Sequence, residues 1–188
     1  MAFLTRIMAL RFHSSWAVSI LVLVLSCQHA SAQTSTLREY EIKAAFLYQF
    51  ANYTEWPPAA LGDKDAPFIL GIYGENPFSD ILNGFTNKFV HDRPIRIKKC
   101  SRLDEAKNCH LLFISSSEKS NLPAILADLK TRSILTVADS ASFLDLGGII
   151  NLITANNKVG FEINVAAAEV AKLKISSQVL GLAKKTKN

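Results

Sequence analysis

Three groups of residues in this chain could do chemistry. Cys100 and Cys109 stand close enough in the chain to form a disulfide bond. Ser115-Ser116-Ser117 follows an apolar run, where a hydroxyl could bind a small ligand or act as a nucleophile. Glu162 interrupts an apolar segment, and a carboxylate in such a place needs either solvent or a partner. The elements around these groups decide which of these roles each can take.

The first 32 residues have the pattern of a secretory signal peptide. Arg6 and Arg11 give a positive start, and the apolar run Ala17 to Ser26 is too short to span a membrane. Ala30-Ser31-Ala32 is an A-x-A cleavage site. We therefore expect residues 1–32 to be removed and the remainder to be secreted.

The three cysteines of the chain fall on both sides of that cleavage site. In a second interpretation Cys27 is a lipidated N-terminus that anchors the protein to a membrane. If cleavage follows Ala32, only Cys100 and Cys109 remain, and in an oxidising compartment we expect them to pair. Two separate buried thiols are the alternative. A zinc site is not expected, because His110 has no second ligand pair at the usual spacing.

Length and charge indicate one domain and exclude some classes of partner. Residues 33–188 are enough for a single domain with its own core. The formal net charge of +5 includes the two signal-peptide arginines, and the other basic residues are spread along the chain, so nucleic acid is not an expected partner. The lysines of Lys184 to Lys187 are expected to form a solvated tail. No cofactor and no metal are predicted.

Short apolar runs alternate with helix-like segments, which is typical of an α/β fold. Ala155 to Lys158 supplies a tight turn between apolar segments, and this predicts a β-hairpin near the C-terminus. We expect a single-domain Rossmann-like three-layer sandwich with a mostly parallel sheet, that hairpin, and flanking helices. The expected strands are Phe68 to Tyr73, Ile95 to Lys99, His110 to Ser115 and Ile134 to Ala138, with a helix at Leu122 to Lys130.

The first expected helix, Leu37 to Asn52, is apolar nearly all round. Two explanations stand: burial between the sheet and the C-terminal helices, or a surface that binds a partner or a second copy of the chain. Under the second, Phe46, Phe50 and Trp56 are the candidate contacts. Under the first, Trp56 is a packing anchor.

A possible ligand pocket is formed by the residues at two strand ends, Gly74 and Asn76 at one and Ser115 and Ser116 at the other. The structural alternatives are a turn with Asn76 as the N-cap of a helix that opens at Pro77, and a serine N-cap. No catalytic residue is predicted, because no G-x-S-x-G elbow surrounds the serines.

Several blocks in order resemble the YfiR family of periplasmic regulators. They are KAAFLYQF at 43–50, EWP at 55–57, GENPF at 74–78, GGII at 147–150, FEIN at 161–164 and LKISSQVL at 173–180. The resemblance implies a non-enzymatic protein that binds the periplasmic sensory domain of an inner-membrane diguanylate cyclase and holds it inactive. Release would raise cyclic di-GMP and promote biofilm formation. Family members also use disulfides, and some have two bridges where this chain can form one.

Polar residues on the C-terminal hairpin and after it are the candidate partner contacts. Glu162 and Asn164 lie in the apolar hairpin, and Gln178 lies in the helical run that follows. The alternative function is a periplasmic protein that binds a small ligand for sensing or uptake, and a serine hydrolase is a more remote third. A homodimer is compatible with either of the first two.

Overall fold

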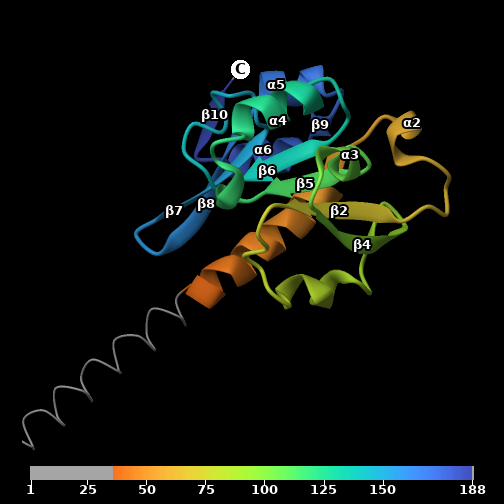
Figure 1. Cartoon of the computed structure of the whole chain (residues 1–188), viewed down its shortest axis with the longest axis horizontal. Coiled ribbons are helices and arrows are strands. Elements are labelled where there is room, and N and C mark those ends of the chain that lie inside the picture. The colour runs from red at the N-terminus through yellow and green to blue at the C-terminus, as the bar shows by residue number, and fades with distance from the viewer. Residues whose placement is uncertain (1–35, 188) are drawn as a thin grey trace, which may run out of the picture. The chain divides into compact units, whose positions relative to one another are not determined.

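The computed structural model describes residues 36–187, so the expected signal peptide and Cys27 lie outside the described residues (Figure 1). The chain divides into two units, residues 1–39 and 40–188. Of the first unit only residues 36–39 are described, and they are helical.

The centre of the second unit is a mostly parallel eight-stranded sheet, as expected. Its strand order is β10-β8-β7-β6-β5-β2-β4-β3. Neighbouring strands from β4 across to β7 are parallel, whereas β7 and β8 form the expected antiparallel hairpin. At the edges, β3 pairs antiparallel with β4, and β10 pairs parallel with β8. The strands are β2 (Phe68–Tyr73), β3 (Phe89–Val90), β4 (Arg93–Cys100), β5 (Leu111–Ile114), β6 (Leu135–Ala138), β7 (Ile150–Ala155), β8 (Lys158–Asn164) and β10 (Lys185–Lys187).

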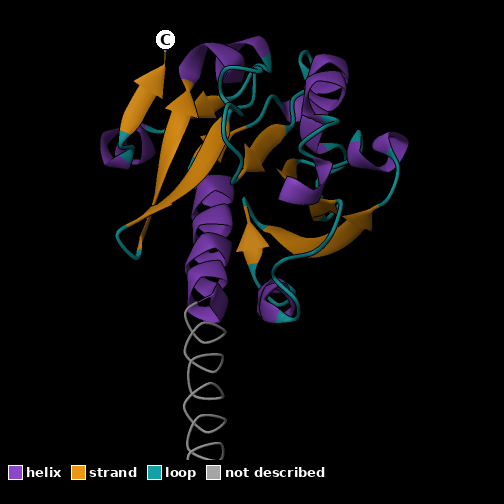
Figure 2. Ribbon diagram, turned by 60° about the vertical axis from the view of Figure 1, so that its left-hand side comes forward, coloured by secondary structure: helices purple, strands orange, loops and turns teal. Residues whose placement is uncertain are grey.

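Helices cover both faces of this sheet, and a separate two-stranded sheet joins β1 (Thr54–Glu55) to β9 (Lys174–Ile175). The first helix spans residues 36–52 of the described chain. In Figure 2 its second-unit part lies between the C-terminal hairpin and the strands β2 to β4. The other helices are α2 (Pro58–Leu61), α3 (Leu103–Ala106), α4 (Leu122–Leu129), α5 (Val165–Val170) and α6 (Ser177–Leu182), with 3-10 turns η1 (Ile81–Phe85) and η2 (Ser116–Glu118).

The three layers follow from side chains that alternate along each strand. In β5, Leu111 and Phe113 join a cluster that includes Leu47 and Phe50 of the first helix. The intervening residues of β5 face the other way and join a cluster with α4. Because β5 is buried on both faces, it reads in the sequence as a continuous apolar run.

Backbone conformation and close packing explain the residue types at the hairpin turn and at Gly147-Gly148 before it. Asn156 and Asn157 have φ of 52° and 57°, the left-handed conformation that a tight hairpin turn requires and that Asn tolerates. Gly147 has φ of 98°. At Gly148 a Cβ atom would lie 2.2 Å from the ring of Phe143, so the missing side chain makes room for that ring.

Two segments differ from the prediction. The chain after Pro77 does not form an α-helix: Asn76 accepts a hydrogen bond from the N–H of Phe78 at 3.0 Å, Ser79 has φ of 47°, and only a 3-10 turn follows. A left-handed residue in the first turn is incompatible with an α-helix. The lysines near the C-terminus are not all a frayed tail, because Lys185–Lys187 pair with β8.

Candidate functional site

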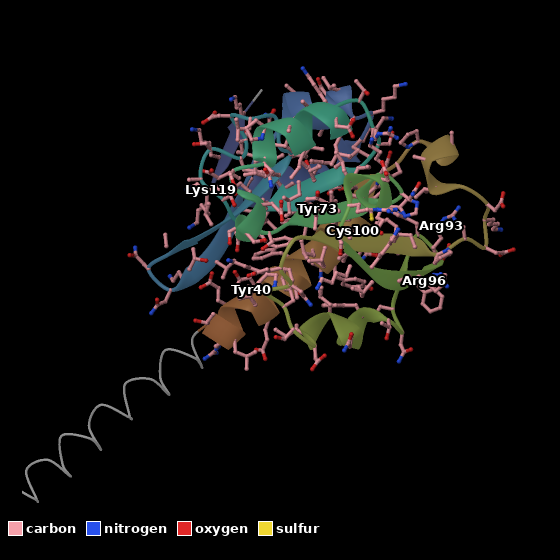
Figure 3. All side chains as sticks on the ribbon, viewed as in Figure 1. Tyr40, Tyr73, Arg93, Arg96, Cys100 and Lys119 are labelled. Atoms are coloured by element: carbon pink, nitrogen blue, oxygen red, sulfur yellow. The ribbon has the colours of Figure 1, made fainter. Side chains whose placement is uncertain are left out.

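A buried ion pair fastens the first helix to the end of β6. Lys43 Nζ lies 2.7 Å from Asp139 Oδ2, and the two side chains are 5% and 9% exposed. The hydroxyl of Tyr40 donates to the same carboxylate oxygen at 3.1 Å, and the Lys43 ammonium lies 4.5 Å from the centre of the Tyr40 ring. Figure 3 shows Tyr40 on the first helix. This pair was not predicted from the sequence.

The loop after β6 is held by amide side chains from the hairpin. Asn151 accepts a hydrogen bond from the N–H of Ser140 at 3.2 Å. Asn164 donates to the carbonyl of Leu144 at 3.0 Å and caps α5 by accepting from the N–H of Ala167 at 3.0 Å. Asn164 is therefore buried in structural hydrogen bonds and is not accessible for direct partner contact in this conformation.

Glu162 and Gln178, the other two polar candidates, are not brought together. Glu162 is half-buried in β8, where its neighbours in register are Asn151 of β7 and Lys185 of β10. Because Phe161 packs against the first helix, Glu162 points to the opposite face of the sheet. Gln178 is exposed on α6, which packs on the first-helix face.

The three aromatic candidates serve mainly as packing. Phe50 is fully buried and Phe46 is half-buried, and both rings contact Phe161. Trp56 is buried, packs edge-on against Phe68 with ring centres 5.2 Å apart, and donates to the carbonyl of His110 at 3.3 Å. The burial explanation of the first helix therefore accounts for most of its apolar residues.

The residues of the expected ligand pocket bond to one another instead. Ser115 is buried, and its hydroxyl accepts a hydrogen bond from the N–H of Ser117, so it caps the 3-10 turn η2. Ser117 in turn accepts from the N–H of Glu75 at 3.0 Å. Gly74 has φ of 89°, and a Cβ atom there would lie 2.5 Å from the Ser117 hydroxyl. The two loops are thus packed together, which matches the structural alternative. Asn76 and Ser116 are exposed beside them.

Cys100 and Cys109 lie side by side, but the expected disulfide is not formed in this structure. Both are buried free thiols with sulfurs 3.7 Å apart, a contact distance rather than the bond length of about 2.05 Å. A hydrogen bond from Cys109 lowers the pKa of the Cys100 thiol, and the same bond together with burial raises the pKa of Cys109. Burial also raises the pKa of Tyr73, which pairs with Cys100 in register and lies near it in Figure 3.

A cavity of about 490 Å³ lies at the opposite, amino ends of β5 and β6. Part of its lining comes from the segments that precede these two strands. This cavity was not predicted from the sequence, because the candidate ligand pocket was placed at the carboxyl ends of the strands. Within residues 36–187, no group of three or more metal-ligating side chains is placed to hold a metal ion. Nor does that part of the chain contain a helix long and apolar enough to cross a bilayer.

Two solved structures resemble part of this chain at low sequence identity. Among solved structures, the chain is similar to a conserved domain protein from Vibrio cholerae O1 biovar El Tor (14% identity, 64% of this chain, 55% of that one, TM-score 0.47). It is also similar to an ABC domain in complex with L-Trp from Streptococcus pneumoniae (10% identity, 68% and 57%, TM-score 0.47). The chain spans a little over half of each.

No curated protein matches this chain. The family model described as YfiR/HmsC-like, by contrast, matches residues 40–184, which include the first helix from Tyr40 onward, the whole hairpin, Cys100 and Cys109. The chain therefore belongs to the YfiR/HmsC-like family.

Proposed function

We propose that this protein is a periplasmic regulator, not an enzyme, that represses an inner-membrane diguanylate cyclase. It binds the periplasmic sensory domain of the cyclase and holds it inactive, which lowers cyclic di-GMP and biofilm formation. The observation that carries the proposal is the family match over residues 40–184. The pattern of the first 32 residues, with a charged start, a short apolar run and an A-x-A site, supports export.

The geometry of the serines and histidines is consistent with a binding protein. The hydroxyls of Ser115 and Ser117 accept backbone hydrogen bonds. His110 accepts from the N–H of Ile69 at 2.8 Å, and His91 is hydrogen-bonded to the carbonyl of Thr54 at 2.9 Å. Each group is thus engaged in local structure, which favours regulation by contact over hydrolysis.

The proposed contact surface uses the accessible members of the candidate set. Glu162 on β8 offers a carboxylate, and Gln178 on α6 offers an amide. The first helix adds the exposed apolar side chain of Ile42, which is 40% exposed, and Tyr53 directly follows the helix with 42% exposure. Since Glu162 and Gln178 lie over different faces of the sheet, a partner that touches both must reach around the edge formed by β10.

Deletion of the gene tests the function. Cellular cyclic di-GMP should rise in the deletion strain and return to its original level when the full chain is restored. The secreted protein should also retain the sensory domain of a membrane cyclase when membranes are passed over it. Cyclic di-GMP that stays unchanged in the deletion strain, in conditions where the wild type makes the protein, would show that repression is the wrong function.

A further inference from the structure

The cavity at the amino ends of β5 and β6 has an unbalanced charge. Its polar lining comes mainly from the segments 107–110 and 132–134, and Lys172 reaches it from the turn after α5. Three of its lining residues, Lys107, Arg132 and Lys172, are cationic, and none is acidic. The side of the cavity near α2 is apolar, formed by Pro57 and neighbouring alanines.

Two of the three cations have no acidic partner in residues 36–187. Lys107 is offset by Asp128 at 2.8 Å and by Asp104 at 3.9 Å. Arg132 and Lys172 form no ion pair with any acidic side chain of that part of the chain. Two unpaired cations that line one cavity favour a negatively charged occupant.

His110 lines the cavity as an uncharged side chain and adds no further positive charge. Its Nδ1 accepts from the N–H of Ile69, and its ring stacks on Phe68 with centres 5.0 Å apart. Burial lowers the pKa of His110, which keeps the imidazole uncharged near neutral pH. The remaining polar lining residues, Asn108 and Ser133, carry neutral hydrogen-bonding groups.

The backbone at Lys172 is an independent reason to assign its side chain a role. Its N–H donates to the carbonyl of Glu169, and the N–H of Leu173 donates to that of Ala168. This is the double hydrogen bond of a Schellman helix end, in which the residue at the position of Lys172 is left-handed and is usually glycine. Lys172 adopts φ of 59° there. A lysine therefore occupies a position where glycine would cost less conformational strain.

We propose that this cavity binds a small organic anion, a carboxylate or a phosphate monoester, between Arg132 and Lys172. The planar guanidinium can hold two oxygens at once, and the ammonium adds a second charge. The apolar side formed by Pro57 and Ala60 covers the carbon part of the ligand. Ligand binding here goes beyond the proposed function and does not depend on it, since it requires no cyclase.

Titration of the protein with benzoate, phenyl phosphate and uncharged benzyl alcohol tests the site, with amide NMR shifts as the readout. The two anions should shift the amides of residues 108–110 and 132–134, and benzyl alcohol should not at equal millimolar concentration. Arg132→Gln and Lys172→Gly should each weaken anion binding about tenfold, as expected for loss of one charged hydrogen bond. Lys172→Gly should not lower the melting temperature, because it relieves the left-handed backbone.

The matched control is Lys174→Gln, which removes the same charge from an exposed lysine outside the lining. It should bind both anions like the wild type. Absence of amide shifts with either anion would overturn the proposal, and so would equal weakening by Lys174→Gln and Lys172→Gly, which would indicate a general charge effect.

Discussion

Lys43 and Asp139 form a buried ion pair that joins the first helix to the end of a central strand, with Nζ and Oδ2 2.7 Å apart. Removing one member leaves the other charged and buried, which destabilises the protein more than replacing both members by apolar residues. This asymmetry gives the first prediction.

Asp139→Asn should lower the free energy of unfolding by about 3 to 5 kcal/mol, because the buried ammonium of Lys43 loses the charged carboxylate of Asp139. Urea denaturation measures this loss. The matched control is Asp145→Asn, which breaks the exposed pair with Lys187 and should change stability little. Replacing both members by Lys43→Met and Asp139→Leu should recover most of the loss, and equal losses in all three variants would contradict the buried pair.

The cysteines give the second prediction. Because their sulfurs already touch, oxidation in the periplasm should join Cys100 and Cys109 with a small local movement. Protein recovered directly from the periplasm should contain no free thiol when denatured without reductant. The bridge closes a loop of roughly ten residues. The free energy of unfolding of the oxidised protein should therefore be about 2.5 to 3 kcal/mol higher than that of the Cys100→Ser, Cys109→Ser double variant. Two free thiols in freshly recovered protein would count against this assignment.

The third prediction concerns the pH dependence of stability. Burial lowers the pKa of His110 below its ordinary 6.5, so the unfolded state takes up a proton before the folded state does. The stability contributed by neutral His110 is therefore complete above about pH 6.5 and is lost as pH falls through the folded pKa. A backbone hydrogen bond from Ser101 holds the pKa of Glu105 below its ordinary 4.5, and a hydrogen bond from Lys187 holds the pKa of Asp145 below its ordinary 3.8. The effects of these two carboxylates on stability therefore fall at a lower pH than that of His110.

His110→Asn places an amide oxygen near the position of Nδ1, where it can still accept from the N–H of Ile69. Urea midpoints measured between pH 7 and pH 5 should fall for the wild type and stay nearly level for the variant. Parallel curves for the two proteins would assign the pH dependence to another group.

The fourth prediction concerns the proposed contact surface. Glu162→Lys should raise cellular cyclic di-GMP, because it reverses the charge presented to the cyclase. Glu169→Lys makes the same change at an exposed position on α5 and should leave cyclic di-GMP unchanged.

Stability must be measured in parallel, because Lys185 lies opposite position 162 in register and would repel a new lysine. Glu162→Gln avoids that repulsion and should raise cyclic di-GMP to a smaller extent at an unchanged melting temperature. A rise that appears only in variants with a lowered melting temperature would give Glu162 a structural role instead.

The sheet could be predicted from the sequence, and the contacts between distant residues could not. The strand Phe68–Tyr73 and the Asn156-Asn157 turn follow from local apolar patterns and from the tolerance of Asn for left-handed backbone. Lys43 and Asp139 are 96 positions apart, and no local pattern links them. Pro77 was predicted to begin a helix, but the backbone at Ser79 is left-handed, so no α-helix forms there.

The residue types of the candidate site could be read from the sequence, but their accessibility to solvent could not. Asn164 and Gln178 look alike as polar residues, yet one is buried as a helix cap and the other is exposed. The cavity beside Arg132 and Lys172 is lined by four separate segments of the chain, so only the fold could reveal it.

The outermost strands of the eight-stranded sheet bear on how the protein avoids aggregation. The edge strand β3 has two residues, and β10 has three, of which two are exposed lysines. Unpaired backbone groups on a long, flat edge would recruit strands from other molecules, whereas short strands and lysines discourage such pairing. By covering the longer β8, β10 protects a strand that would otherwise be a template for assembly between copies.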